Sequence, residues 1–185
     1  MRADPAAFRA AAARFATGVT VVASLGPDAA PVAMTANSFT TVSTRPPTVL
    51  VSLMPGRTFQ AVKETGRYAV SVLAAQDLAV CSHFAGRAMA GRGPQASEAL
   101  KAPGATDLVE RDGFFVLPQA LAQFACEVVR MIEVADHALF VAEVAWCRHS
   151  DGAPLAFHAS RFRHGLGAEI RPVEVAAYPA DAWAI

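Results

Sequence analysis

The sequence predicts a mainly β fold, a closed or half-closed β-barrel with a few flanking helices. Short runs of β-branched and aromatic residues recur along the chain, and clusters of Gly, Pro, Asn and Asp separate them at short intervals. Few segments have the apolar period of a helix. Many short strands with turns between them are typical of a barrel, whereas a doubly wound parallel sheet would need a regular strand–helix alternation.

The first part of the chain predicts one helix followed by strands. Asp4 is a good helix-capping residue, and Pro5 suits the first helical position. An apolar stripe at helical spacing runs from Phe8 to Phe15, and Gly18 is expected to end this helix. Strands are then predicted over residues 20–24, 32–34, 39–42 and 49–53. The last of them is a nearly continuous apolar run, which predicts a strand buried on both faces.

Two short helices are expected in the middle of the chain. Thr58 is expected to cap the first, which ends at Gly66, and residues 76–84 have a helical pattern. Residues 86–113 are rich in Gly, Pro, Ala and charge without a clean period, so a long excursion with some helix is expected there. The remaining strands are predicted over residues 68–73, 121–134, 138–147 and 155–158.

Length and composition indicate one folded domain. A chain of 185 residues is long enough to bury a hydrophobic core without disulfides. Apolar residues make up 54% of it and charged residues only 17%, which excludes a disordered protein. So low a charged fraction suggests that some apolar surface is buried against a partner chain. We therefore expect a single domain over residues 1–185 that pairs with a second chain.

The charge distribution narrows the class of ligand. Sixteen Lys and Arg residues balance sixteen Asp and Glu residues, whereas a nucleic-acid-binding protein normally has a basic surplus. Residues 1–92 hold nine basic and four acidic residues, and residues 93–185 hold seven and twelve. We expect no nucleic-acid partner, and we expect any bound anion in the first half of the chain.

Cysteine usage and hydropathy predict a cytoplasmic protein. Cys81, Cys126 and Cys147 are odd in number and far apart, which argues against a disulfide framework or a zinc site. No signal peptide is recognised at the N-terminus. No apolar run reaches the roughly 18 residues that a membrane span needs, so no membrane contact is expected.

The common catalytic motifs are absent from the sequence. It contains no P-loop, no HExxH pair and no GxSxG serine elbow. Gly165-Leu166-Gly167 lacks the third glycine and the strand–turn–helix context of a dinucleotide-binding fingerprint. Neither a metal site nor an acid–base pair is therefore expected.

A candidate ligand site lies where polar residues interrupt the strand pattern. Residues 35–38 carry hydroxyl and amide side chains, and Ser52 is the lone hydroxyl in an apolar strand. Arg57 and Thr58 begin a helix, whose N-terminus is a ready anion site. Together these residues predict a ligand with a phosphate at one end and a flat polar heterocycle at the other. Taken separately, residues 35–38 are better explained as an ordinary turn, and Thr58 as an ordinary helix cap.

Several segments resemble one family in the same order along the chain. They are residues 15–22, 31–40, 46–53, 66–73, 83–86, 120–128 and 136–144. These segments are closely similar to the flavin reductase-like proteins, the FMN-binding split-barrel reductases that supply reduced flavin to two-component monooxygenases. The resemblance covers about residues 8–165 and leaves residues 166–185 as a C-terminal tail. It implies a six-stranded antiparallel split barrel that acts as a homodimer, with flavin near the subunit interface.

The resemblance also implies roles for particular residues. The flavin ring and ribityl chain would be contacted by Thr35, Ala36, Asn37 and Ser38. The ribityl and phosphate end would be lined by Ser52, Leu53 and Thr58, with help from Arg57. The wall of the pocket would be formed by Phe84, Ala85 and Gly86. His137 would lie near the nicotinamide of NADH or NADPH.

The sequence departs from the family pattern at three places. Ala135 replaces the usual glycine before Asp136, which puts the placing of His137 in question. A tyrosine is usual at Phe157 or Phe162, so a hydroxyl contact is lost there. Residues 86–113 match poorly.

The resemblance predicts an NAD(P)H-dependent reductase of FMN or FAD that serves a partner monooxygenase. Hydride transfer is the chemistry of the two cofactors, so no catalytic side chain is expected. One alternative is a flavin-binding electron carrier or redox module without fast turnover. Another is a flavin-dependent oxidase or oxygenase that acts on an organic substrate in the same barrel.

Overall fold

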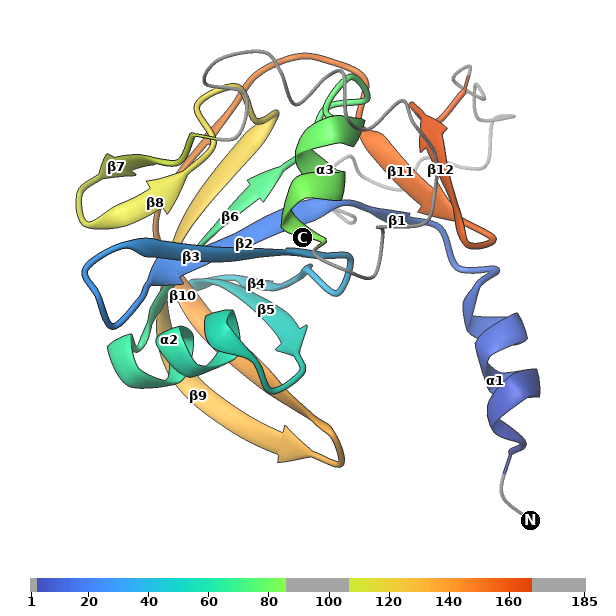
Figure 1. Ribbon diagram of the computed structural model, residues 1–185, viewed down its shortest axis with the longest axis horizontal. Coiled ribbons are helices and arrows are strands. Elements are labelled where there is room, and N and C mark those ends of the chain that lie inside the picture. The colour runs from blue at the N-terminus through green and yellow to red at the C-terminus, as the bar shows by residue number, and fades with distance from the viewer. Residues whose placement is uncertain (1–2, 86–106, 168–185) are drawn as a thin grey trace.

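Three helices and twelve strands are present in residues 3–85 and 107–167, the parts of the chain that the computed structural model describes (Figure 1). The helices are α1 (Pro5–Ala12), α2 (Arg57–Thr65) and α3 (Leu78–Phe84). The strands are β1 (Thr17–Gly18), β2 (Thr20–Leu25), β3 (Pro31–Ala36), β4 (Thr40–Thr44), β5 (Pro47–Leu53), β6 (Arg67–Val72), β7 (Val109–Arg111), β8 (Phe114–Val116), β9 (Ala122–Val134), β10 (His137–His149), β11 (Leu155–His158) and β12 (Arg161–His164). This confirms the predicted mainly β fold.

The main sheet is antiparallel, has the strand order β3-β2-β6-β9-β10-β5-β4, and curls into a barrel. Its outer strands β3 and β4 lie at opposite ends of this order, yet only residues 37–39 separate them in the chain. In a flat sheet the two edges would be about 29 Å apart, further than so short a connection can reach. The sheet must therefore bend round until β3 and β4 approach each other. The expected count of six strands is not confirmed, since this sheet has seven.

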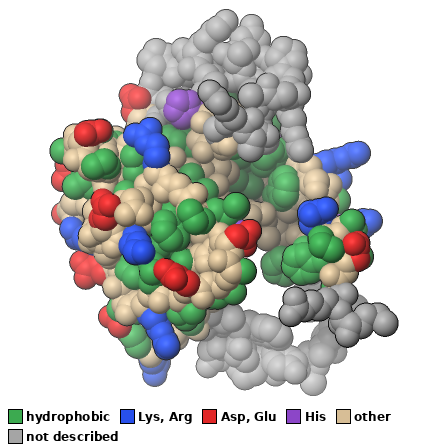
Figure 2. Space-filling view, turned by 60° about the horizontal axis from the view of Figure 1, so that its bottom comes forward, with side chains coloured by type: hydrophobic (Ala, Val, Ile, Leu, Met, Phe, Trp, Pro, Cys, Tyr) green, Lys and Arg blue, Asp and Glu red, His purple; other side chains and the backbone are tan. Residues whose placement is uncertain are grey.

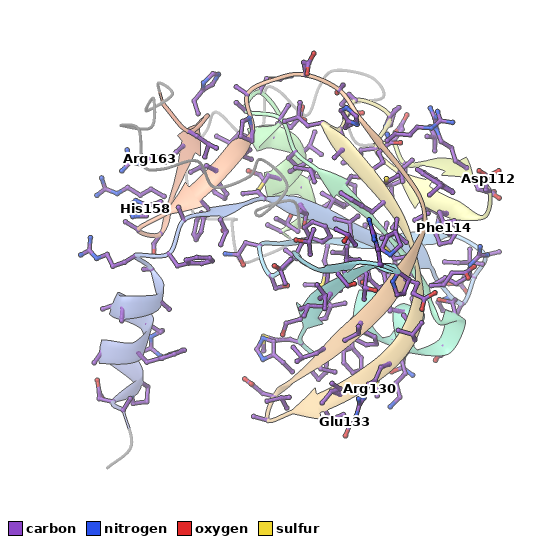
Figure 3. The ribbon with its side chains drawn as sticks, turned by 180° about the vertical axis from the view of Figure 1, so that it is seen from behind. Asp112, Phe114, Arg130, Glu133, His158 and Arg163 are labelled. Atoms are coloured by element: carbon purple, nitrogen blue, oxygen red, sulfur yellow. The ribbon has the colours of Figure 1, made fainter. Side chains whose placement is uncertain are left out.

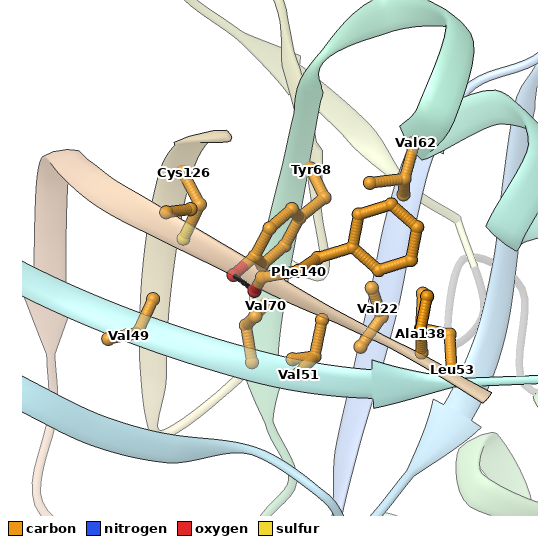
Figure 4. Packing of buried hydrophobic residues seen from close by; sticks show 11 residues of the cluster. Val22, Val49, Val51, Leu53, Val62, Tyr68, Val70, Cys126, Ala138 and Phe140 are labelled. Atoms are coloured by element: carbon orange, nitrogen blue, oxygen red, sulfur yellow. Dashed lines mark hydrogen bonds between the residues drawn. The ribbon is translucent and has the colours of Figure 1, made fainter. Parts of the chain in front are cut away.

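Apolar side chains fill the inside of the barrel (Figure 4). Val22, Val62 and Phe140 are fully buried there, and the Phe59 ring of α2 meets the Phe140 ring edge-on at 5.3 Å. The Tyr68 hydroxyl donates a hydrogen bond to the Phe140 carbonyl at 3.2 Å, which satisfies a polar group in the core. Helix α2 thus closes one side of the barrel.

A second apolar layer covers the outer face of β2 and β6. Helix α3 lies over this face, and its Val80 forms one buried cluster with Val21, Leu73 and Leu117. Phe114 of the β7–β8 hairpin belongs to a separate cluster beside it. Because both faces are covered, every residue of β2 except Leu25 is buried.

Helix α1 begins as predicted but ends earlier. Asp4 accepts hydrogen bonds from the backbone N–H groups of Ala6 and Ala7 at 3.0 and 2.9 Å. The helix ends at Ala12, so Gly18 does not end it but lies in β1. No residue of α1 is buried, and the helix stands apart from the barrel at the right of Figures 1 and 2.

Three other predictions are wrong in detail. β3 continues to Ala36, so the polar break begins only at Asn37. β5 alternates between buried and half-buried residues from Thr48 to Leu53, because only one of its faces meets the barrel core. Gly56, and not Thr58, occupies the capping position of α2, and Thr58 is the second residue of the helix.

Part of the predicted excursion and tail lies outside the described residues. These parts are residues 86–106 and 168–185. The described end of the excursion forms β7 and the turn into β8, a hairpin that the sequence pattern did not predict. Within residues 3–85 and 107–167, no helix is both long and apolar enough to cross a membrane.

Candidate functional site

The predicted flavin-site residues lie at four places where helices and strands end or begin. These are the end of β3, the connection to β4, the junction of β5 with α2, and the C-terminal end of α3. Hydrogen bonds between the segments, described next, hold them together. Gly86, the last predicted wall residue, lies outside the described residues.

Thr35 attaches the end of α3 to β3. Its Oγ1 donates a hydrogen bond to the Cys81 carbonyl at 2.8 Å, and the Ala85 N–H donates to the same oxygen at 3.0 Å. The neighbouring Phe84 is half-buried and packs against the second apolar layer. The Thr35 hydroxyl is therefore used within the fold, and it holds Phe84 and Ala85 beside the end of β3.

Ser38 joins the β3–β4 connection to β5. Its Oγ donates to the Ser52 carbonyl at 2.8 Å and accepts from the Ser52 N–H at 3.1 Å. Because Ser38 occupies both backbone groups of Ser52, only the Ser52 hydroxyl remains for a ligand. The side chain of Leu53 is 1% exposed and belongs to the barrel core, so this residue has only its backbone to offer.

A pocket of about 180 Å³ opens beside Asn37. Thr35, Ala36 and Asn37 line one side of it, and Val19 contributes to the wall. The rings of Phe157 and Phe162 also line it, with their centroids 5.1 Å apart. The Asn37 side chain is exposed and makes no hydrogen bond with the described residues. The sequence draws attention to these two phenylalanines only through the missing hydroxyl, although apolar rings in a β-hairpin can form the wall of a pocket.

The N-terminus of α2 presents unused hydrogen-bond donors. No side chain caps this helix, since Gly56 stands at the capping position. The first backbone N–H of α2 with a helical acceptor is that of Gln60, bonded to the Gly56 carbonyl at 3.0 Å. Thr58 is 4% exposed, its hydroxyl has no hydrogen-bond partner among the described residues, and Arg57 is exposed. Free N–H groups, a hydroxyl and a guanidinium thus meet in one helical turn.

His137 lies at the same end of the barrel as the start of α2. It begins β10, where the next residue, Ala138, pairs with Leu53 at the end of β5. Its Nδ1 is 2.8 Å from Oδ1 of Asp136, and this contact holds the pKa of Asp136 below its usual range. Ala135 adopts a φ of +52°, the left-handed conformation in which glycine is usual. The turn before His137 therefore forms without the family's glycine.

Burial makes the nearby thiols poor acids. It raises the pKa of the Cys81 thiol to about 11 and that of the Cys126 thiol to about 12. Burial also raises the pKa of Asp77, whose carboxylate accepts a hydrogen bond from the Ala74 N–H at 3.0 Å. In the described part of the chain, no group of three or more His, Cys, Asp or Glu side chains is placed to hold a metal ion. The site offers binding groups and a shaped pocket.

Fold and site together define a class: a mainly β barrel with an apolar-walled pocket and an uncapped helix start at one end. The sequence profile of one family, the flavin reductase like domain, matches residues 12–166. The chain therefore belongs to the flavin reductase-like family.

Named relatives match nearly the whole chain. The NADH-dependent flavin reductase StyB of Pseudomonas fluorescens is 36% identical over 165 residues, which are 88% of this chain and 90% of the relative. The solved styrene monooxygenase flavin reductase of Pseudomonas putida S12 superposes with a TM-score of 0.75 at 37% identity, covering 88% of this chain and 99% of that one. The NADH:FAD oxidoreductase of Streptomyces globisporus, solved in complex with NAD and FAD fragments, has a TM-score of 0.72 at 30% identity, covering 90% and 97%. The homologues are thus NADH-dependent flavin reductases, and several are components of two-component monooxygenases.

Proposed function

We propose that this protein is an NADH-dependent flavin reductase that reduces FMN or FAD. One observation carries the proposal. The pocket beside Asn37 lies next to the β5–α2 junction, and the Ser38–Ser52 hydrogen bonds join the two. One end of this region offers a slot between apolar walls, and the other offers donors for an anion. A flavin nucleotide needs both.

The residues present fit a flavin phosphate. The free N–H groups at the start of α2 and the unpartnered Thr58 hydroxyl donate hydrogen bonds, and the Arg57 guanidinium adds positive charge. The positive end of the helix dipole acts in the same direction. We assign the phosphate end to Arg57 and Thr58, with the Ser52 hydroxyl and the Leu53 backbone beside it.

The residues present also fit a planar ring. Asn37 has both a free carbonyl and a free amide group, which suit the alternating donors and acceptors of the flavin pyrimidine edge. Ala36 leaves room beside it, and Phe157 and Phe162 exclude water from the opposite wall. We assign the ring to Thr35 through Ser38, and we assign Phe84, Ala85 and Gly86 to the pocket wall.

The bound cofactors supply the hydride chemistry, and the protein supplies position. Asn37 fixes the orientation of a ring, and the apolar walls keep water out. Ala138, the neighbour of His137, pairs with Leu53. Leu53 follows Ser52, which Ser38 joins to the ring side of the site beside Asn37. We assign His137 to contact with the nicotinamide, a positional role that needs no proton transfer.

NADH oxidation by the purified full-length protein, followed at 340 nm with and without added FMN or FAD, tests the proposed function. A reductase oxidises NADH rapidly only when flavin is present, and reduced flavin accumulates without oxygen. Tight flavin binding with negligible turnover would favour the electron-carrier alternative. Turnover that also requires an organic substrate would favour the oxidase alternative.

We further propose that the single-domain chain acts as a homodimer. Support comes from large apolar side chains that the described residues leave exposed: Phe8 and Phe15 next to the pocket side of the barrel, and Val42, Met54, Val129 and Val134 on strands or their ends. An obligate dimer buries more than about 2,000 Å² of surface, and such residues favour burial of this kind.

We also propose a partner monooxygenase and a cytoplasmic location. The partner is supported by relatives such as the reductase component of the 4-nitrophenol monooxygenase of Rhodococcus opacus, 29% identical over 167 residues. The location is supported by the three cysteines, all of which are free thiols.

A further inference from the structure

A polar pocket of about 170 Å³ lies among β7, β9 and β10. Arg111 at the end of β7, Gln123 in β9, and Arg148 and His149 at the end of β10 line it, together with Ser150. Arg148 faces Gln123 directly across the β9–β10 pair. Three segments of the chain thus line one hollow with two arginines, a histidine and a serine. The Arg148 guanidinium also lies 5.9 Å from the centre of the Trp146 ring.

The positive charge in this pocket is not neutralised by the described residues. No Asp or Glu lines it, and neither Arg111 nor Arg148 has a carboxylate within 4.0 Å in residues 3–85 and 107–167. The described arginine that does form an ion pair is Arg67, with Glu127 at 3.5 Å. Arginine is always charged at neutral pH, and its planar fork of donors suits the oxygens of a tetrahedral anion. We propose that this pocket binds a phosphate group.

Gln123 places a further chemical requirement on the molecule bound in this pocket, and phosphate meets it. This side chain is 5% exposed, and its Nε2 donates to the Leu117 carbonyl at 2.8 Å, which fixes the orientation of the amide. Its Oε1 has no donor among the described residues. A buried acceptor without a partner is unfavourable, so the occupant should bring a donor as well as negative oxygens. Inorganic phosphate keeps a P–O–H group at neutral pH, whereas sulfate is fully ionised.

The pocket is separate from the candidate flavin site. Thr35, Val21, Ser71, Gln123 and Arg148 are successive cross-strand neighbours on β3, β2, β6, β9 and β10. At the usual strand spacing, Gln123 lies about 14 Å from Thr35 along the sheet, and Arg148 about 19 Å. The buried cluster around Val21 and Leu117 lies between them. The phosphate site therefore does not depend on the proposed reductase activity.

Calorimetric titration of inorganic phosphate into the full-length protein saturated with FMN tests the proposal, in phosphate-free buffer at constant ionic strength. FMN then occupies the phosphate end assigned to Arg57 and Thr58, so the phosphate that binds reports the second pocket. We expect saturable binding of one phosphate per chain and at least about tenfold weaker binding of sulfate. Arg111→Gln with Arg148→Gln should weaken phosphate binding at least about tenfold. Arg130→Gln is the matched control: this exposed arginine is on the same strand as Gln123 but lies about 23 Å along it, at the bottom of Figure 3, far from the hairpin tip at Asp112.

Two further measurements decide the outcome. The double variant should keep the wild-type circular dichroism spectrum and wild-type flavin-dependent NADH oxidation, because neither arginine belongs to the candidate flavin site. Displacement of phosphate by NADPH, whose 2′-phosphate is a monoester, would identify a nucleotide as the source of the phosphate group. Undiminished phosphate binding in the presence of NADPH would identify free phosphate. Absence of saturable phosphate binding, or equal binding by wild type and a folded double variant, would overturn the proposal. Equal affinity for sulfate would overturn the part assigned to Gln123.

Discussion

At the scale of single residues, the position of Thr58 in α2 differs from the capping position that the sequence predicts. The sequence predicts that Thr58 caps α2, but Gly56 holds that position. The Thr58 residue is 4% exposed, and its hydroxyl has no hydrogen-bond partner among the described residues. Its free state is what a binding role for a phosphate would require.

Thr58→Val tests this role, because valine keeps the shape of threonine and removes the hydroxyl. A hydrogen bond to a charged phosphate contributes about 1.5–3 kcal/mol, so FMN binding should weaken by about tenfold or more. Riboflavin, which has no phosphate, should bind the variant and the wild type alike. Quenching of flavin fluorescence measures both affinities, and the exposed Thr40→Val on β4 serves as control. An unchanged affinity for FMN would return Thr58 to a structural role.

His137→Ala tests the nicotinamide assignment. If His137 only positions the nicotinamide, kcat/KM for NADH should fall about tenfold, equivalent to about 1.4 kcal/mol, while FMN affinity stays constant. Steady-state kinetics and flavin titration separate these effects. His164→Ala, an exposed histidine on β12, is the control. Wild-type kcat/KM in the His137 variant would make it an ordinary turn residue.

The buried thiols give a prediction on reactivity. Burial raises the pKa of Cys81 to about 11 and that of Cys126 to about 12, so neither forms appreciable thiolate at pH 8. Iodoacetamide should leave both unmodified in the native protein and modify all three cysteines after denaturation, as read by mass spectrometry. Rapid native modification of either would show that the second apolar layer or the core opens readily.

At the scale of elements, the long β9–β10 hairpin has two different faces. Phe140 points into the barrel and is fully buried, while its neighbour Leu139 is half-buried on the outer face. Phe140→Ala should lower the free energy of unfolding by about 3–5 kcal/mol, because it leaves a cavity against Phe59 and Val62. Leu139→Ala is the matched comparison and should cost clearly less. Urea denaturation measures both, and equal losses would contradict the assignment of the faces.

Elements also differ in how far local signals determine them. Asp4 and Gly66 were recognised from sequence, since a cap and a left-handed glycine act through their own backbone neighbours. The end of α1 and the hairpin β7–β8 were missed. Gly18 enters a strand because β11 offers it a partner about 140 residues later in the chain, and no local pattern carries that information.

At the scale of the whole molecule, contacts within one chain do not explain the position of α1. No residue of α1 is buried. Phe8 in the helix is 65% exposed, and Phe15 just after it is 77% exposed. Where the helix joins the barrel, the Ala159 N–H donates a hydrogen bond to the Ala13 carbonyl at 2.8 Å. A pocket of about 390 Å³ separates the helix from β11. A helix with an apolar side and nothing to cover it favours contact with a second copy.

The uncovered apolar side of α1 leads to a prediction about the oligomeric state. Sedimentation at micromolar concentration should give a dimer, and Phe8→Ser with Phe15→Ser should weaken it without changing the β-sheet circular dichroism. Replacing the exposed charged residue Arg14 by Gln is the control. A wild-type monomer at that concentration would contradict the proposal, and a dimer unaffected by the double variant would move the interface elsewhere.

The sequence by itself determined the mainly β class, most strands, and the membership of residues 35–38, Ser52 and Thr58 in one candidate site. Strand pattern, turns and short motifs are local, and the resemblance added the order in which they occur. Only the tertiary structure decided which groups remain free for a ligand. Thr35 and Ser38 are used to join α3 and β5 to the barrel edge, Leu53 turns into the core, and Asn37 and Thr58 keep unpaired polar groups. Whether a polar side chain is used within the fold or stays free depends on which backbone carbonyls lie within hydrogen-bonding distance of it. Those carbonyls belong to segments that are brought together only when the sheet closes.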